Sequence, residues 1–191
     1  MFNPLQADIQ LGHFCIRHRV QAKDEPLPPG IAVYQVHGDQ IFEPVADEAQ
    51  DETRSYQPEA GFDAVIWKHP ASRVLHIKTA DCLPVVMVDH HAAAYANVHA
   101  GWRGLAAGIL TKTAARLRDL GVGTPALRVY LGPAITQPHY EVGEEVWQAF
   151  QRRPYADRLR RYCFFPSATR GRYLFDLKGA AVQELLAAGV Q

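Results

Sequence analysis

The stretch LPVVMVDHHAAAYANVH, residues 83–99, does most to decide how this chain folds. Residues 83–89 form a nearly continuous apolar run, which is typical of a strand buried on both faces. After a short turn at residues 89–91, residues 92–99 predict the next strand. Two strands in direct succession, with no helix between them, favour a sheet that is not strictly parallel.

Further elements are predicted on both sides of this pair. Extended segments with β-branched and aromatic residues are expected at 31–36, 40–45, 64–67, 74–78, 127–131 and 173–176. Apolar residues at helical spacing predict helices over 105–120, 144–152 and 177–188. This interleaving predicts an α/β (α+β) fold with mixed sheets. A chain of 191 residues suits a single domain over residues 1–191.

The composition argues against several classes of protein. Twenty basic and twenty acidic residues give a formal net charge of zero, so neither nucleic acid nor an anionic membrane is an expected partner. No apolar run reaches the roughly 18 residues of a membrane-spanning helix, and residues 1–10 do not resemble a signal peptide. Because Cys15, Cys82 and Cys163 are too scattered for a disulfide framework, we expect reduced thiols and a cytoplasmic location.

Three candidate metal ligands stand at the ends of predicted strands. Cys82 lies in TADCLP just before the strand at 83–89, His99 lies in NVHAGWRG, and His37 lies in QVHGD. Two imidazoles and one thiolate with an open fourth position match a catalytic zinc site, although copper accepts the same ligands. The ligands share no local spacing motif, so a buried thiol and structural histidines are the alternative interpretation.

The neighbours of these residues suggest an anion site. In GWRG, residues 101–104, the close glycines allow backbone N–H groups to approach a ligand at a helix start. Arg103 could add charge-assisted hydrogen bonds, for example to phosphate, unless the segment is only a tight turn with a surface arginine. Asp81 could orient one of the two histidines or carry a proton.

The motifs QVHGD, TADCLPV and NVHAGWRGLAAGIL, in this order, resemble the bacterial laccase-domain family. This family is described both as multicopper polyphenol oxidases and as purine nucleoside phosphorylases. The segments LGPAI, YEVGEEV and FDL extend the resemblance over roughly residues 31–190. The resemblance implies a four-layer α/β/β/α fold, similar to the catalytic domains of cytotoxic necrotizing factors.

The resemblance also implies an activity and a set of site residues. It implies zinc bound by His37, Cys82 and His99, and phosphorolysis of adenosine and inosine with adenosine deamination as a side activity. Catalysis would fall to Cys82, His99 and Asp81. A nucleoside and phosphate would be the partners, held by Arg103, by Gly101 and by Arg17, which lies in FCIRH (residues 14–18), where the family has an F-S-T-R-type strand. We further expect a chain that is shorter than the family at both ends, and a monomer or weak homodimer.

Other functions remain open at this point. In a cysteine hydrolase or amidase, such as one that edits cell-wall precursors, Cys82 would be the nucleophile and His99 the base. Copper polyphenol oxidation would require several coppers, whereas the sequence offers one cluster of three ligands. A non-catalytic metal-binding protein is the remaining alternative. Stoichiometric zinc on the Cys82 thiolate would argue against a free nucleophile, and stabilisation by metal but not by nucleosides would favour the non-catalytic role.

Overall fold

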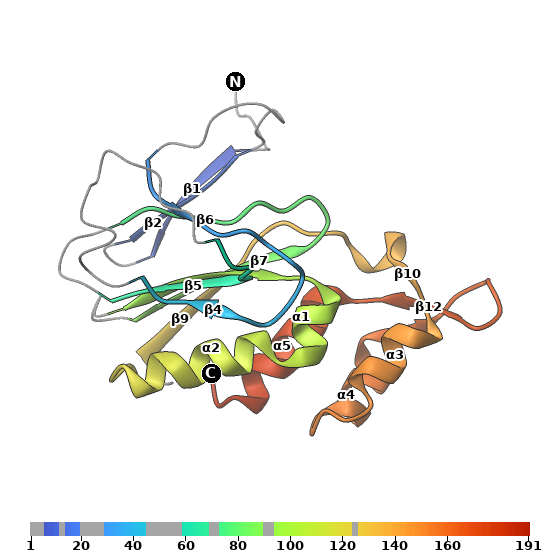
Figure 1. Ribbon diagram of the computed structural model, residues 1–191. Helices are drawn as coiled ribbons and strands as arrows, with labels where there is room; N and C mark the ends of the chain where they lie inside the picture. The colour runs from blue at the N-terminus through green and yellow to red at the C-terminus, as the bar shows by residue number, and fades with distance from the viewer. Residues whose placement is uncertain are drawn as a thin grey trace.

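The computed structural model describes the backbone of residues 6–11 and 14–19, and residues 29–44, 59–68, 73–89, 94–123 and 126–191 in full. At its centre is a five-stranded sheet with the order β4-β5-β8-β7-β9 (Figure 1). β4 runs parallel to β5, and the other neighbours are antiparallel. The five strands are β4 (Ile41–Phe42), β5 (Ala64–Trp67), β7 (Leu83–Asp89), β8 (Tyr95–Ala100) and β9 (Leu127–Leu131). The predicted α/β class with mixed sheets is therefore confirmed.

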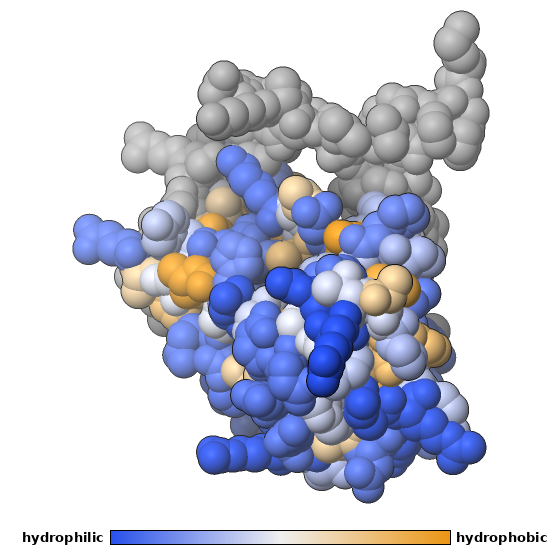
Figure 2. Space-filling view, turned by 90° about the vertical axis from the view of Figure 1, so that its right-hand side faces the viewer, coloured by the Kyte–Doolittle hydropathy of each residue, from blue (hydrophilic) through white to orange (hydrophobic). Residues whose placement is uncertain are grey.

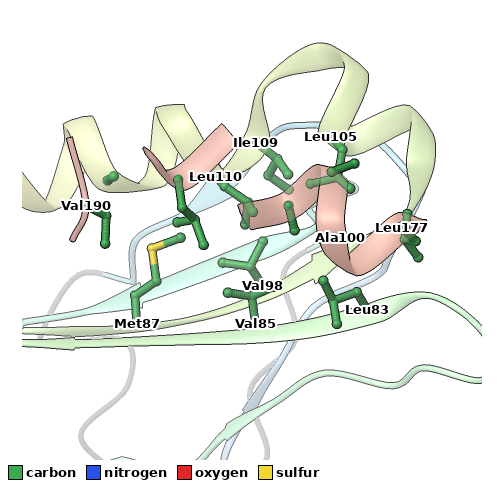
Figure 3. Close-up of a cluster of buried hydrophobic side chains, with 14 of the residues drawn as sticks. Leu83, Val85, Met87, Val98, Ala100, Leu105, Ile109, Leu110, Leu177 and Val190 are labelled. Carbon is green, nitrogen blue, oxygen red and sulfur yellow. The ribbon is translucent and has the colours of Figure 1, made fainter. Parts of the chain in front are cut away.

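One face of this sheet is apolar and is covered by helices. Side chains alternate between the two faces of a strand, and the apolar residues on this face include Ile66 of β5, Leu83, Val85 and Met87 of β7, and Val98 of β8. Helices α1 (Trp102–Ala107) and α2 (Ile109–Asp119) pack against it, and α5 (Leu177–Ala187) packs against both of these helices. In Figure 3, Leu83, Val85, Met87 and Val98 of the sheet face Leu105, Ile109 and Leu110 of the helices. Each such side chain, once fully buried, contributes about 1.5–3 kcal/mol.

The opposite face carries a second, smaller core. Above it lie the parallel pair β3 (Ile31–Ala32) and β6 (Leu75–His76) and the antiparallel hairpin of β1 (Gln6–Leu11) and β2 (Phe14–Arg19) (Figure 1). The Asn97 side chain links the two layers by donating a hydrogen bond to the Leu75 carbonyl, at 3.0 Å. The buried residues of this core are Ile31, Val33, Val65 and Trp67. Helices, sheet and strand pairs thus correspond to the α/β/β part of the predicted layer order.

The helix predicted over residues 105–120 is divided into α1 and α2. The break falls at Gly108, whose φ of 88° lies in the left-handed region that favours glycine. The Arg153 guanidinium lies over this glycine, and a Cβ there would come within 2.7 Å of Nη2. The apolar spacing continues across the break, which explains why the sequence predicts one helix. At its other end α2 stops before Gly121 (φ 94°), as predicted for a glycine that ends a helix.

A buried carboxylate stabilises the start of α2. Glu184 of α5 is fully buried, and its Oε1 accepts a hydrogen bond from the Thr111 N–H in the first turn of α2, at 2.8 Å. Burial raises the pKa of Glu184 to about 7, although the Thr111 N–H and the positive charge of Arg153 oppose this rise. Glu184 is therefore a buried acid that titrates near neutral pH.

The C-terminal part forms a three-stranded antiparallel sheet with two helices. The strand order is β10-β12-β11, and Phe164 and Phe175 pack within it with ring centroids 4.5 Å apart. Its outer face, towards the viewer in Figure 2, is strongly hydrophilic. The elements are η2 (Gln137–His139), β10 (Glu141–Gly143), α3 (Glu144–Phe150), α4 (Ala156–Tyr162), β11 (Phe164–Pro166) and β12 (Arg172–Phe175). No helix in the described part of the chain is long and apolar enough to span a membrane.

Candidate metal centre

His37, Cys82 and His99 lie together, although they come from three separate segments of the chain. Cys82 immediately precedes β7, His99 lies near the end of β8, and His37 lies in the connection between β3 and β4. Their ligand atoms all lie within 4.8 Å of one another. The two imidazole rings meet edge to face with centroids 4.8 Å apart. The structure therefore brings all three predicted ligands into one cluster.

The antiparallel register of β7 and β8 explains why Cys82 meets the start of α1. Leu83 pairs with Ala100, so the residues just beyond this pair, Cys82 and Gly101, come side by side. A Cβ on Gly101 would lie 3.1 Å from the Cys82 Sγ and 3.5 Å from the His37 Cδ2. Only a glycine leaves this side of the cluster clear.

The side chain of Asp63 contacts the imidazole ring of His99 in the interior of the protein. Both residues are buried, and the His99 Nδ1 lies 2.7 Å from the Asp63 Oδ1. If Nδ1–H donates to this carboxylate, the lone pair of Nε2 remains available to a metal, which is the usual arrangement of a histidine ligand. Burial lowers the pKa of His99, although Asp63 opposes this, so the ring favours its neutral, ligand-competent form.

His37 has an unusual backbone conformation that Asp63 stabilises. Its φ of 61° is the only positive φ of a non-glycine residue in the part of the chain described. The Asp63 carboxylate accepts hydrogen bonds from three successive N–H groups, those of Val36 at 3.2 Å, His37 at 2.9 Å and Gly38 at 2.6 Å. His37 is exposed, Cys82 is half-buried and His99 is buried, so the cluster opens to the surface on the His37 side.

The charges around Cys82 match those of a cation site. Burial raises the pKa of the Cys82 thiol, and the negative charges of Asp81 and Asp63 raise it further. A divalent cation would act in the opposite direction, because it stabilises the thiolate. Two imidazoles and a thiolate surrounded by carboxylates therefore fit a metal ion such as zinc.

The three residues predicted to bind substrate differ in where they lie relative to the cluster and in how much of them the structure describes. Gly101 borders the cluster, as described above. Arg103 is exposed at the start of α1, and its guanidinium stacks on the Trp102 ring at 4.3 Å from the centroid. Arg17 lies on β2, but its side chain falls outside the described residues. The binding roles of these residues stay predictions, as do a cytoplasmic location and a monomeric or weakly dimeric state.

Asp81 was predicted to orient one of the two histidines or to carry a proton, and the structure places a different carboxylate beside His99. Asp81 is exposed, and its main-chain carbonyl accepts a hydrogen bond from the Ile135 N–H at 2.9 Å. The carboxylate that contacts His99 is that of Asp63, which enters from the start of β5. A role for Asp81 in orienting His37, or as a proton carrier, stays a prediction.

Tyr140 is a neighbour of the cluster that the sequence did not indicate as a site residue. Burial and, to a smaller extent, a negative charge on Cys82 raise its pKa to about 12, and Arg103 opposes this rise. The hydroxyl group therefore stays protonated at neutral pH and can donate a hydrogen bond. Its only sequence signal is its position at the start of YEVGEEV, a segment that extended the family resemblance.

Several known proteins are similar to this chain. A protein named purine nucleoside phosphorylase from Pseudomonas aeruginosa is 39% identical over 156 residues, which cover 82% of this chain and 57% of the relative. A protein named adenosine deaminase from an unknown prokaryotic organism is 35% identical over 130 residues, covering 68% of this chain and 48% of the relative. The chain thus spans about half the length of these curated relatives.

Solved structures and a family model agree with these relatives. The crystal structure of the Bacillus licheniformis hypothetical protein YfiH is similar with a TM-score of 0.70 and 27% sequence identity, covering 84% of this chain and 60% of that one. The model of a family described as multi-copper polyphenol oxidoreductase laccase matches residues 16–191. This match includes all three residues of the cluster, and the chain therefore belongs to the multi-copper polyphenol oxidoreductase laccase family.

Proposed function

We propose that this chain binds zinc at His37, Cys82 and His99 and catalyses the phosphorolysis of purine nucleosides such as adenosine and inosine, with adenosine deamination as a side activity. The observation that carries this proposal is the convergence of the three ligand atoms within 4.8 Å. The names of the relatives, purine nucleoside phosphorylase and adenosine deaminase, support the choice of reaction and substrate.

Zinc is favoured over copper by the kind of site that the donors can form. Two nitrogen ligands and one sulfur ligand with an open position are typical of catalytic zinc, which would polarise a substrate oxygen or a water molecule. Copper also accepts two histidines and a cysteine, so the donor set alone does not decide between the metals. Polyphenol oxidation by a multicopper centre is less well supported, because the described residues contain one such cluster.

The surrounding residues can be given roles in phosphorolysis. A phosphate oxygen forms a bond to the ribose anomeric carbon while the bond from this carbon to the purine nitrogen breaks, and that nitrogen takes up the electron pair and a proton. We assign the phosphate to Arg103, whose exposed guanidinium can form charge-assisted hydrogen bonds, with Arg17 as a further pocket residue. The protonated hydroxyl of Tyr140, whose pKa of about 12 lies well above neutral pH, is assigned as the hydrogen-bond donor to the departing base.

The alternative of a free cysteine nucleophile has less support from the site. A nucleophilic cysteine needs a lowered pKa, whereas burial, Asp81 and Asp63 raise the pKa of Cys82. The thiol would therefore be protonated at neutral pH when no cation is bound.

The test combines metal analysis with product analysis. Purified protein supplied with zinc is incubated with adenosine and phosphate, and adenine, ribose 1-phosphate and inosine are separated by chromatography. We expect one zinc per chain and both phosphorolysis products, and we expect Cys82→Ala to lose the metal and the products. Cys163→Ala is the matched control, since this other free cysteine is buried beside α5, apart from the cluster. A wild-type protein without products, or undiminished products in Cys82→Ala, would contradict the proposal.

A further inference from the structure

We propose that Asp63 is the positioning residue of this centre, a single carboxylate that sets the ring tautomer of His99 and the backbone conformation of His37. This inference rests on the proposed function only in taking the two histidines as metal ligands. Asp63 itself is not a ligand, since its oxygens are directed to N–H groups.

The carboxylate is fully engaged by four nitrogen donors. Its Oδ1 lies 2.7 Å from the His99 Nδ1 and 2.9 Å from the His37 backbone nitrogen. Its Oδ2 lies 2.6 Å from the Gly38 nitrogen and 3.2 Å from the Val36 nitrogen. A carboxylate offers about four lone-pair sites, so these four donors use its whole capacity as an acceptor. Asp63 is also completely buried, which leaves water no access to compete for these bonds.

The main chain of Asp63 is fixed as firmly as its side chain. Its carbonyl accepts a hydrogen bond from the His99 N–H at 2.7 Å, and its own N–H donates to the Gln40 carbonyl at 3.0 Å. The side chain therefore projects from a point that is tied to β8 on one side and to the segment after His37 on the other. Any shift of the carboxylate would have to move both segments that carry the histidines.

The bonds to residues 36–38 offset the cost of the backbone at His37. A left-handed conformation is unfavourable for a non-glycine residue, because its Cβ comes too close to the following carbonyl oxygen. Three successive N–H groups converge on one carboxylate in this turn, and hydrogen bonds to a charged group are stronger than those between neutral groups. Asp63 can therefore keep His37 turned towards Cys82 and His99 before any metal binds.

Replacing Asp63 with asparagine should change which ring nitrogen of His99 carries the proton. If the amide oxygen takes the place of Oδ1, the NH2 group faces the N–H groups of Val36 and Gly38, and two backbone donors lose their acceptor. If the NH2 group takes the place of Oδ1, only the His37 N–H loses its acceptor, and His99 can respond by moving its proton from Nδ1 to Nε2. The second orientation leaves fewer donors unpaired, so Asp63→Asn should place a proton on the nitrogen that would bind the metal.

The experiment measures the tautomer and the metal affinity separately. The 15N chemical shifts of the imidazole nitrogens are recorded for metal-free wild type and Asp63→Asn, and zinc affinity is measured by competition with a chromophoric chelator. We expect the proton of His99 on Nδ1 in wild type and on Nε2 in Asp63→Asn, together with a 10–100-fold loss of zinc affinity, about the usual effect of losing such a partner.

Asp176→Asn is the matched control. Asp176 caps α5 by accepting a hydrogen bond from the Gly179 N–H at 2.8 Å, and asparagine is an equally good cap. This variant should therefore keep the wild-type tautomer and zinc affinity.

Two results would overturn the role of Asp63. One is a wild-type His99 with its proton on Nε2, which can be observed even if the variant does not fold. The other is an Asp63→Asn protein with unchanged tautomer and unchanged zinc affinity. Failure of the proposed function is a different result, because a wild type that binds zinc but forms no ribose 1-phosphate leaves the predicted tautomer and affinity changes intact.

Discussion

Replacing Glu184 with glutamine should flatten the pH dependence of stability at neutral pH. The folded protein binds the proton of this buried acid more tightly than the unfolded chain does, because burial raises the pKa of Glu184 from 4.5 to about 7. The stabilisation from this group is complete below pH 4.5 and is lost as the pH rises through 7. At 1.36 kcal/mol per pKa unit, the full effect is about 3 kcal/mol, of which about 1.4 kcal/mol falls between pH 6 and pH 8.

The assay is urea unfolding of wild type and Glu184→Gln at a series of pH values. Subtracting the two free energies of unfolding removes the contributions of groups that the proteins share. Glutamine can still accept the hydrogen bond from Thr111. Because glutamine does not ionise, the free energy of unfolding of the variant should rise relative to that of wild type by about 1.4 kcal/mol between pH 6 and pH 8. Glu145→Gln is the control, because this exposed glutamate of α3 carries the same charge, and its profile should follow wild type. Parallel profiles for wild type and Glu184→Gln would refute the reasoning.

Three further predictions concern the cluster and the core. Gly101→Ala should lower zinc affinity and cost about 1–3 kcal/mol of stability, since the new Cβ would lie 3.1 Å from the Cys82 Sγ; chelator competition and thermal melting measure the two effects, and wild-type affinity would contradict the crowding argument. Leu110→Ala should cost about 2–5 kcal/mol in urea unfolding, because this side chain is fully buried between α2 and the sheet, and a loss below 1 kcal/mol would count against that packing. Free zinc at about 100 times its dissociation constant should stabilise wild type by about 2.7 kcal/mol in thermal melts and leave Cys82→Ala unchanged; equal stabilisation of both would place the metal elsewhere.

The sequence predicted the elements best where burial leaves a simple pattern. The strands at 64–67, 83–89 and 127–131 have the predicted bounds, because each is a continuous run of residues suited to a buried sheet. The strand predicted at 31–36 is limited to β3, since the chain then turns towards the cluster. Helix α4 was missed because Leu159 is its only fully buried residue, so its arginine-rich sequence has little apolar periodicity.

The three candidate ligands could be predicted from ligand chemistry. The carboxylate that contacts the two histidines, that of Asp63, could not. His37, Cys82 and His99 could be proposed because each stands at a strand end and because the motifs resemble a family. Asp63 carried no comparable signal, since a single aspartate before a short strand is typical of many loops. Its importance depends on the pairing of β5 with β8, where Ala64 lies opposite Val98 and brings Asp63 beside His99. Pairing of this kind cannot be read from spacing along the chain.

The cluster also has a consequence for how the protein unfolds. Its three side chains are far apart in sequence, so an ion held by all of them would close two long loops of the chain at once, as a covalent cross-link does. The entropy that such a closure removes from the unfolded chain grows with loop length. Local opening near the His37 turn would release one of the three bonds to the ion, whereas complete unfolding would have to break all three. The ion would then act most strongly on global unfolding, and hydrogen exchange in β7 and β8 should slow more than exchange in the C-terminal sheet when zinc is added.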